Sequence, residues 1–204
     1  MIQPDLLASI RQRFQEAKLI SPVDITALFV ALLTSYFSNS ENIQHETLKN
    51  RTYDPDYDKT KIIIDAAGRW APENAGTRPA ILIARGEWRT IQEGAEGGRI
   101  LGSVPATYVR KYLGQHRLQC ISKSPAETDL LVDEVFRFLI HIEPIILQEL
   151  PFITFAVQGI GPLAAVPEGR QHWLSTILVT YSFAESWMIT TPVTEIEQPP
   201  IPVE

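Results

Sequence analysis

The pattern of apolar and polar positions is most regular between residues 124 and 147. Apolar side chains recur there every three or four residues, which is the spacing of one buried face of a helix. These positions are Leu131, Val135, Phe138 and Ile142, flanked by Val132, Phe136 and Leu139. The charged residues fall on the other side, where we expect them to face solvent. They are Asp129, Asp133, Glu134 and Arg137. The pattern predicts a long amphipathic helix that needs an apolar sheet to pack on.

Both ends of this helix carry boundary residues. Ser124 is followed by Pro125, and Glu127 stands three residues after the serine. This is a capping signature, in which the serine accepts a hydrogen bond from the first turn and the glutamate reaches back to the cap. Pro144 is expected to kink or end the helix, because proline lacks a backbone donor and clashes with the preceding turn.

Two further helices are expected near the N-terminus. Residues 5–18 have an apolar face with helical spacing. Ser21 followed by Pro22 predicts the start of a second helix over residues 22–37. This second helix is apolar around most of its circumference. We therefore expect it to be buried, either in the core of its own chain or against a neighbouring subunit.

The remaining pattern is that of strands. Residues 172–185 alternate most strictly between apolar and polar positions. Shorter strand candidates are residues 62–64, 79–85, 87–92, 117–123, 151–159 and 187–191. Residues 99–113 mix basic residues with tyrosines and are expected as a solvated segment with the tyrosines packed inward.

Alternation assigns faces to two of these strands. In residues 117–123, Leu118 and Cys120 are expected on one face. In residues 151–159, the predicted common face is made by Ile153, Phe155 and Val157.

The order of elements predicts an α+β fold. Short connections between neighbouring strands favour a mostly antiparallel sheet, with the long helix packed across one face. N-terminal helices and an irregular arm complete this architecture. We expect four parts: an N-terminal helical segment (1–38), the irregular arm (39–78), the α+β core (79–191) and an extended Pro-rich tail (192–204).

Composition narrows the class of protein. The chain has 204 residues, of which 45% are hydrophobic, and this suits a folded protein. Its formal net charge is -6, which argues against tight binding of nucleic acid through the overall field. A negative net charge instead suits a channel through which DNA slides, because the protein and the DNA phosphates repel each other. No signal pattern opens the chain, and no apolar run reaches the ~20 residues of a membrane span. We therefore expect a protein made in the cytoplasm, with no membrane partner.

No motif specifies a reaction, so we expect no enzyme activity, no cofactor and no metal. Cys120 is the one cysteine and is expected to act as a small core hydrophobe. The histidines lack zinc spacing and are expected at the surface or at sheet edges. They are His45, His116, His141 and His172.

One acidic cluster calls for comparison with a calcium loop. Asp54, Asp56 and Asp58 alternate as calcium ligands do, but the glycine and the glutamate that complete such a loop are missing. A solvated turn is the simpler interpretation.

Four elements follow one another in a recognisable order. They are the strand of residues 116–122, the helix that opens with Ser124-Pro-Ala-Glu127, the strand of residues 152–158, and the long strand from Trp173 to Trp187. This order is similar to the sheet-and-helix core of bacteriophage tail terminator proteins, and the resemblance covers residues 79–191. The N-terminal helices and the segment 38–75 are longer than in a minimal terminator.

The resemblance implies a structural role in the phage neck. Such proteins form a ring, usually a hexamer, that caps the tail tube and joins it to the head connector. The implied partners are other copies of the chain, the tail tube or sheath, and the head connector, with genomic DNA passing through without specific binding. The implied location is the virion. Another neck component (a head-completion adaptor or stopper), a non-viral α+β binding domain and an enzyme of unrecognised type are the alternatives.

Loop-rich segments supply the candidate contacts for a ring. Trp70 and Trp88 are candidate anchors, because tryptophan often dominates interface energetics. That both tryptophans simply fill the core is an equally good interpretation. Glu93, Glu96 and Arg99, in and beside the loop 93–98, complete the candidate interface.

Overall fold

Two long strands and the helix between them organise the fold. The computed structural model describes residues 4–16, 20–69, 78–91, 99–100, 106–166 and 171–189. The helices are α1 (Pro4–Glu16), α2 (Pro22–Phe37) and α4 (Pro125–Glu149). The strands are β1 (Ile63–Ala66), β2 (Ala80–Ile91), β3 (Arg99–Ile100), β4 (Ala106–Ser122), β5 (Phe152–Ile160), β6 (Ala164–Ala165) and β7 (Trp173–Ile189).

The strands form one mixed, mostly antiparallel sheet. Its order is β1-β2-β4-β7-β5, with β3 paired to β4 and β6 paired to β7. β1 runs parallel to β2, and the other pairs are antiparallel. Together with the long helix that packs against the strands, this confirms the expected α+β class.

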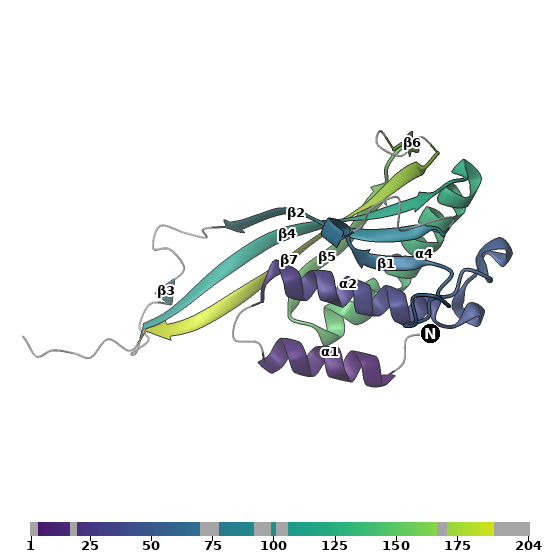
Figure 1. Ribbon diagram of the computed structural model, residues 1–204. Coiled ribbons are helices and arrows are strands. Elements are labelled where there is room, and N and C mark those ends of the chain that lie inside the picture. Colours follow the sequence, from purple (N-terminus) through teal and green to yellow (C-terminus); the bar gives the residue numbers. More distant parts are fainter. Residues whose placement is uncertain are drawn as a thin grey trace, which may run out of the picture.

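The helices cover one face of the sheet (Figure 1). α2 packs against β1 and β2, and α4 packs against β5 and β7. Seven residues of α2 are buried, so this helix belongs to the core of its own chain. The segment between α2 and β1 contributes to the same core through Ile43, Leu48 and Ile62.

The starts of the two longer helices differ in one respect. At α2, Ser21 and Asp24 form a complete capping box. At α4, Ser124 accepts from the backbone N–H of Glu127 as predicted. The Glu127 carboxylate, however, binds Ser122 and Arg51 (2.7 Å to Arg51) instead of reaching back to the cap. The predicted return bond is therefore wrong: the Ser124 N–H donates to the Ser122 hydroxyl, and this hydroxyl donates to the Glu127 carboxylate.

Pro144 does not end α4, which continues to Glu149. The residues that follow, Ile146 and Leu150, are buried and keep the last turns on the sheet. Pro144 itself is exposed. Water can therefore reach the carbonyl group that loses its helical donor.

Three strands are longer than predicted. The candidates 79–85 and 87–92 are one strand, β2, with an irregularity between Arg85 and Trp88. β4 begins at Ala106, inside the segment expected to be solvated. β7 likewise joins the two last strand candidates into one strand of 17 residues.

A register shift changes the predicted faces of β5. Phe152 and Phe155 are buried, whereas Ile153 is exposed. The pairing of β5 with β7 shifts between Phe152 and Thr154, so strict alternation does not hold there. The predicted common face of Ile153 and Phe155 is therefore wrong. By contrast, Leu118 and Cys120 are both buried on one face of β4, as expected.

Glu134 is buried in the core, contrary to the solvent-facing position predicted for it. Its carboxylate accepts hydrogen bonds from the Tyr36 hydroxyl (2.5 Å), the Gln44 amide (2.8 Å) and the His45 amide (3.0 Å). These three donors satisfy a charge that would be costly to bury alone. Glu134 thus ties the loop after α2 to α4.

Asp133, the neighbour of Glu134, stays near the surface. Its Oδ2 atom lies 2.7 Å from Arg137 Nε and 2.8 Å from His45 Nε2, so the predicted pair with Arg137 is confirmed. The hydrogen bond from Arg137 is the main cause of a lowered pKa of Asp133.

We predict that Glu134→Gln lowers the free energy of unfolding by about 3 kcal/mol. The amide nitrogen of glutamine would face a backbone donor, and the remaining donors would lose a charged acceptor. Urea unfolding measures the effect. Asp133→Asn is the matched control, expected to cost under about 1 kcal/mol because that pair is exposed. Equal losses in the two variants would contradict this role of Glu134.

Candidate functional site

The most distinctive surface feature is a β-ribbon formed by the ends of β4 and β7. We define the ribbon as residues 106–112 and 183–189, which pair in continuous register. In Figure 1 the tip of this ribbon extends to the left, past the ends of α1 and α2. β2 and β3 each pair with part of β4 in the ribbon, but within the described residues the outer edge of β7 beyond Phe183 has no strand beside it, and such an edge can pair with another chain. The ribbon is therefore a candidate for contact with another molecule.

Aromatic rings pack together where the ribbon leaves the core. Tyr112 and Phe183 stack with their centroids 5.3 Å apart, and Trp88 lies 5.5 Å from Phe183. Gly114 lets Tyr181 cross the sheet beside them, because a Cβ at Gly114 would lie 2.4 Å from the tyrosine ring. The cluster fixes the direction in which the ribbon leaves the sheet.

The predicted contact residues have different positions in the chain. Trp88 is half-buried in the aromatic cluster, so much of its side chain packs on the core. Arg99 lies in β3, where its backbone pairs with Tyr108 of the ribbon. Trp70, Glu93 and Glu96 lie outside the described residues. The ribbon itself was not among the predicted contacts.

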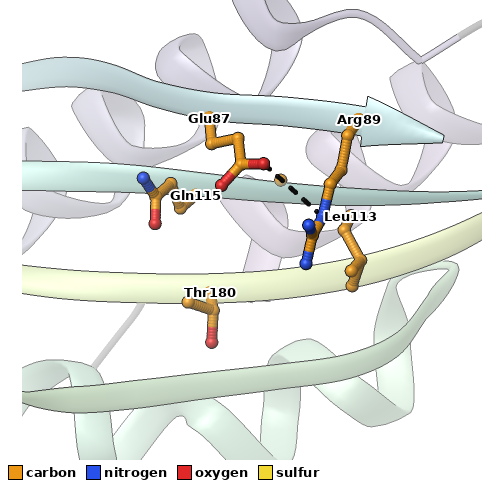
Figure 2. Close-up of a pocket in the computed structure, with 6 residues that line it drawn as sticks. Glu87, Arg89, Leu113, Gln115 and Thr180 are labelled. Atoms are coloured by element: carbon orange, nitrogen blue, oxygen red, sulfur yellow. Dashed lines mark ion pairs between the residues drawn. The ribbon is translucent and has the colours of Figure 1, made fainter. Parts of the chain in front are cut away.

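The face of the sheet that the helices leave open is polar along its middle. Figure 2 shows Glu87, Arg89, Leu113, Gln115 and Thr180 standing on this face around a shallow hollow of about 160 Å³. The Arg89 and Glu87 side chains approach to 3.5 Å. A second hollow of about 340 Å³ adjoins it, and its lining includes Gln115, Arg117, Gln158, Thr176 and Leu178. The amide, hydroxyl and charged groups that line these two hollows suit a broad polar contact with another molecule.

A more apolar groove lies on the other side of the molecule. It has a volume of about 310 Å³ and lies between α2, the loop after it, and α4. Its lining includes the aromatic rings of Tyr36 and Phe138 together with His141 and Ile145. Burial and the bond to Glu134 raise the pKa of Tyr36, so its hydroxyl stays protonated. The groove can accept an apolar side chain or a small ring.

His116 is fully buried, which corrects the prediction that the histidines lie at the surface or at edges. Its Nε2 atom lies 2.9 Å from Thr26 Oγ1, and its Nδ1 atom lies 2.8 Å from the Tyr181 hydroxyl. The Thr26 hydroxyl donates to the Pro22 carbonyl, so it accepts from Nε2–H, and Tyr181 donates to Nδ1. The neutral imidazole thus joins α2 to β4 and β7.

Burial is the main cause of a lowered pKa of His116, which falls to about 4. The nearby Arg85 cation acts in the same direction, and a hydrogen bond to Pro22 opposes both. Phe29 packs 5.5 Å from the imidazole ring on the α2 side. An imidazole enclosed in this way serves as a structural link between helix and sheet.

Other candidate groups take structural positions in the described residues. Cys120 is fully buried, and burial raises the pKa of its thiol, as expected of a core hydrophobe. Asp54 and Asp56 accept backbone hydrogen bonds in a turn, and Asp56 pairs with Lys59 at 3.0 Å. Within the described residues no three histidine, cysteine or acidic side chains group as metal ligands.

Comparisons with known proteins leave the family open. Neither a scan of protein-family models nor a search of curated proteins gives a match for this chain. Among the described helices, none combines the length and the apolar character needed to cross a bilayer.

We predict that stability depends on pH through His116. The unfolded imidazole has a pKa near 6.5 and the folded one about 4, so the unfolded state binds more protons between these values. The contribution of His116 to the free energy of unfolding should thus be fully present above pH ~6.5. This free energy should fall by about 3 kcal/mol as the pH drops to ~4. Urea unfolding across this range measures the slope.

His116→Gln should flatten this slope, whatever its effect on absolute stability. His141→Gln, at an exposed position, is the control and should keep it. The same slope in all three proteins would contradict a titrating role for His116.

Proposed function

We propose that this protein is a structural component of a bacteriophage neck, of the tail terminator type. It forms a ring that caps the tail tube and joins it to the head connector. The observation that carries the proposal is the ribbon, which continues the sheet beyond the helices that cover its core. A projecting ribbon is a natural means for one subunit to reach the next.

The arrangement of the core supports the proposal. The four elements on which the resemblance rests are β4, α4, β5 and β7. β7 lies between β4 and β5 in the sheet, and α4 crosses the same strands. These elements form a sheet-and-helix core of the expected kind. The two edges of this sheet differ, since β1 is parallel and β5 antiparallel to its neighbour, and unlike edges suit head-to-tail contacts that close by rotation.

The charge of the chain fits a channel for DNA. A net charge of -6 on each copy disfavours tight binding of the phosphate backbone. DNA would then pass through the ring without being held. The partners proposed are further copies of the chain, the tail tube or sheath, and the head connector. An adaptor or stopper of the same neck would share these features.

One observation favours a different class of function. The groove of about 310 Å³ beside Tyr36 and Phe138 combines apolar side chains with the polar groups of Asn42, Gln44 and His141, as a small-ligand or peptide site does. A binding domain that acts as a monomer is therefore the second candidate. The two candidates differ in solution, because only the first requires a closed assembly.

We predict that the purified chain assembles into closed rings, either alone or on the ends of tail tubes. Native mass spectrometry and negative-stain electron microscopy measure the assembly. Genes for portal and tail-tube proteins beside its own gene would agree with this result. A chain that stays monomeric at high concentration and ignores tube ends would contradict the proposal.

A ribbon variant makes the same experiment specific. Val109→Pro removes a backbone N–H of β4 within the ribbon and fixes its φ, and it should abolish rings while far-UV circular dichroism stays close to that of the parent. Val109→Thr keeps the donor and should still form rings. Rings of normal stability in the proline variant would show that the ribbon is not required.

A further inference from the structure

The first helix, α1, docks on the rest of the protein through one small group of side chains. Ile10 and Phe14 are buried, Leu6 packs beside the core, and Arg11 forms an ion pair with Glu149 at the end of α4. In Figure 1, α1 is the helix at the lower edge of the view. A helix of 13 residues is only marginally stable by itself in water. We therefore treat α1 as an element with two states, docked and undocked.

An aromatic row connects α1 to the ribbon. Phe14 packs on Phe152 at the start of β5, with ring centroids 6.1 Å apart. The ring of Phe152 lies 6.4 Å from that of Phe183, its partner in the β5–β7 ladder. Phe183 stacks on Tyr112 of the facing strand. Contiguous rings thus run from α1 to both strands of the ribbon.

A polar link joins the ribbon to the residue that precedes α2. The carboxylate of Glu185 accepts from the backbone N–H of Ile20 at 2.7 Å, although the two residues are 165 positions apart. Tyr112 also donates to Glu185, and burial together with this carboxylate raises the pKa of Tyr112. Hydrogen bonds to a charged acceptor are stronger than those between neutral groups. One carboxylate therefore binds the ribbon and the chain between α1 and α2 at the same time.

Both links end at the root of the ribbon, by which we mean Tyr112, Phe183 and Glu185. Beyond Phe183 the outer edge of β7 has no strand beside it within the described residues. The contacts with Phe14 and Ile20 restrain the ribbon at this point, where pairing with β5 stops.

We propose that α1 is a clasp for the ribbon, with Glu185 as the positioning residue that couples the two. When α1 undocks, the ribbon loosens, and when the ribbon is held, α1 docks more firmly, because such coupling is reciprocal. A clasped ribbon loses less conformational entropy when it contacts another molecule, so the clasp favours ring assembly. Only this effect on assembly rests on the proposed function, since the coupling itself belongs to the single chain.

Hydrogen exchange of the free chain tests the coupling from the ribbon side. Glu185→Val removes the acceptor and suits a strand, and Ser186→Val, at the exposed next position, is the matched control. Glu185→Val should speed exchange of the α1 amides about tenfold, because a bond to a charged acceptor is lost, whereas Ser186→Val should not. Glu185→Gln, which keeps a neutral acceptor, should restore part of the protection. Unchanged amides of Leu118 and Ile177 would show that the fold is intact.

Phe14→Ala tests the coupling from the α1 side. This change removes the ring that contacts Phe152, and the ribbon amides should then exchange about tenfold faster. Ser9→Ala, at an exposed position of α1, is the control. The effects of Phe14→Ala and Glu185→Val should not add, since either change undocks α1. Faster exchange confined to α1 in Phe14→Ala, or to the ribbon in Glu185→Val, would overturn the clasp.

Ring assembly separates the clasp from the proposed function. Phe14→Ala should raise the midpoint concentration of assembly about fivefold, and Ser9→Ala should leave it unchanged. Equal midpoints would overturn the part of the clasp in assembly but leave the ring standing. Coupled exchange in a chain that forms no rings would support the clasp and overturn the proposed function.

Discussion

The pairing of β4 with β7 is the interaction on which the rest of the structure depends. The two strands pair in unbroken register over 17 residues, from Ala106–Ile189 at one end to Ser122–Trp173 at the other. The helices pack against one end of this strand pair, and the other end is the ribbon. A slip of one residue would turn Leu118 and Ile177 from the core to the open face. The buried face of the sheet therefore sets the register of the ribbon.

Two buried polar groups set how the N-terminal part packs on this sheet. His116 links α2 to β4 and β7, and Glu134 links the loop after α2 to α4. Apolar contacts alone tolerate sliding, whereas a buried polar group keeps its partners only in one arrangement. Together they hold the helices on one half of the sheet. The ribbon is left uncovered as a result.

Sequence patterns predicted the parts of the fold that local chemistry determines. The bounds of α2 and the start of α4 followed from Ser21, Ser124 and the prolines after them. The burial of Glu134 depends on backbone donors from another segment of the chain. The helical periodicity around Glu134 carries no information about these donors. Residues 106–112 were missed because their basic residues suggested a solvated loop, although Tyr108, Val109 and Tyr112 are typical of strands. The candidate surface was therefore only partly predicted, through Arg99 and Trp88 beside the ribbon.

Hydrogen exchange of the ribbon amides tests the central claim, that the ribbon is completed by another copy. In the free chain, amides of the ribbon (residues 106–112 and 183–189) should exchange much faster than those of β4 and β7 under the helices. In assembled rings, the ribbon amides should become protected, while the core amides change little. Ribbon amides that are as protected in the free chain as in the core, or that stay unprotected after assembly, would contradict it.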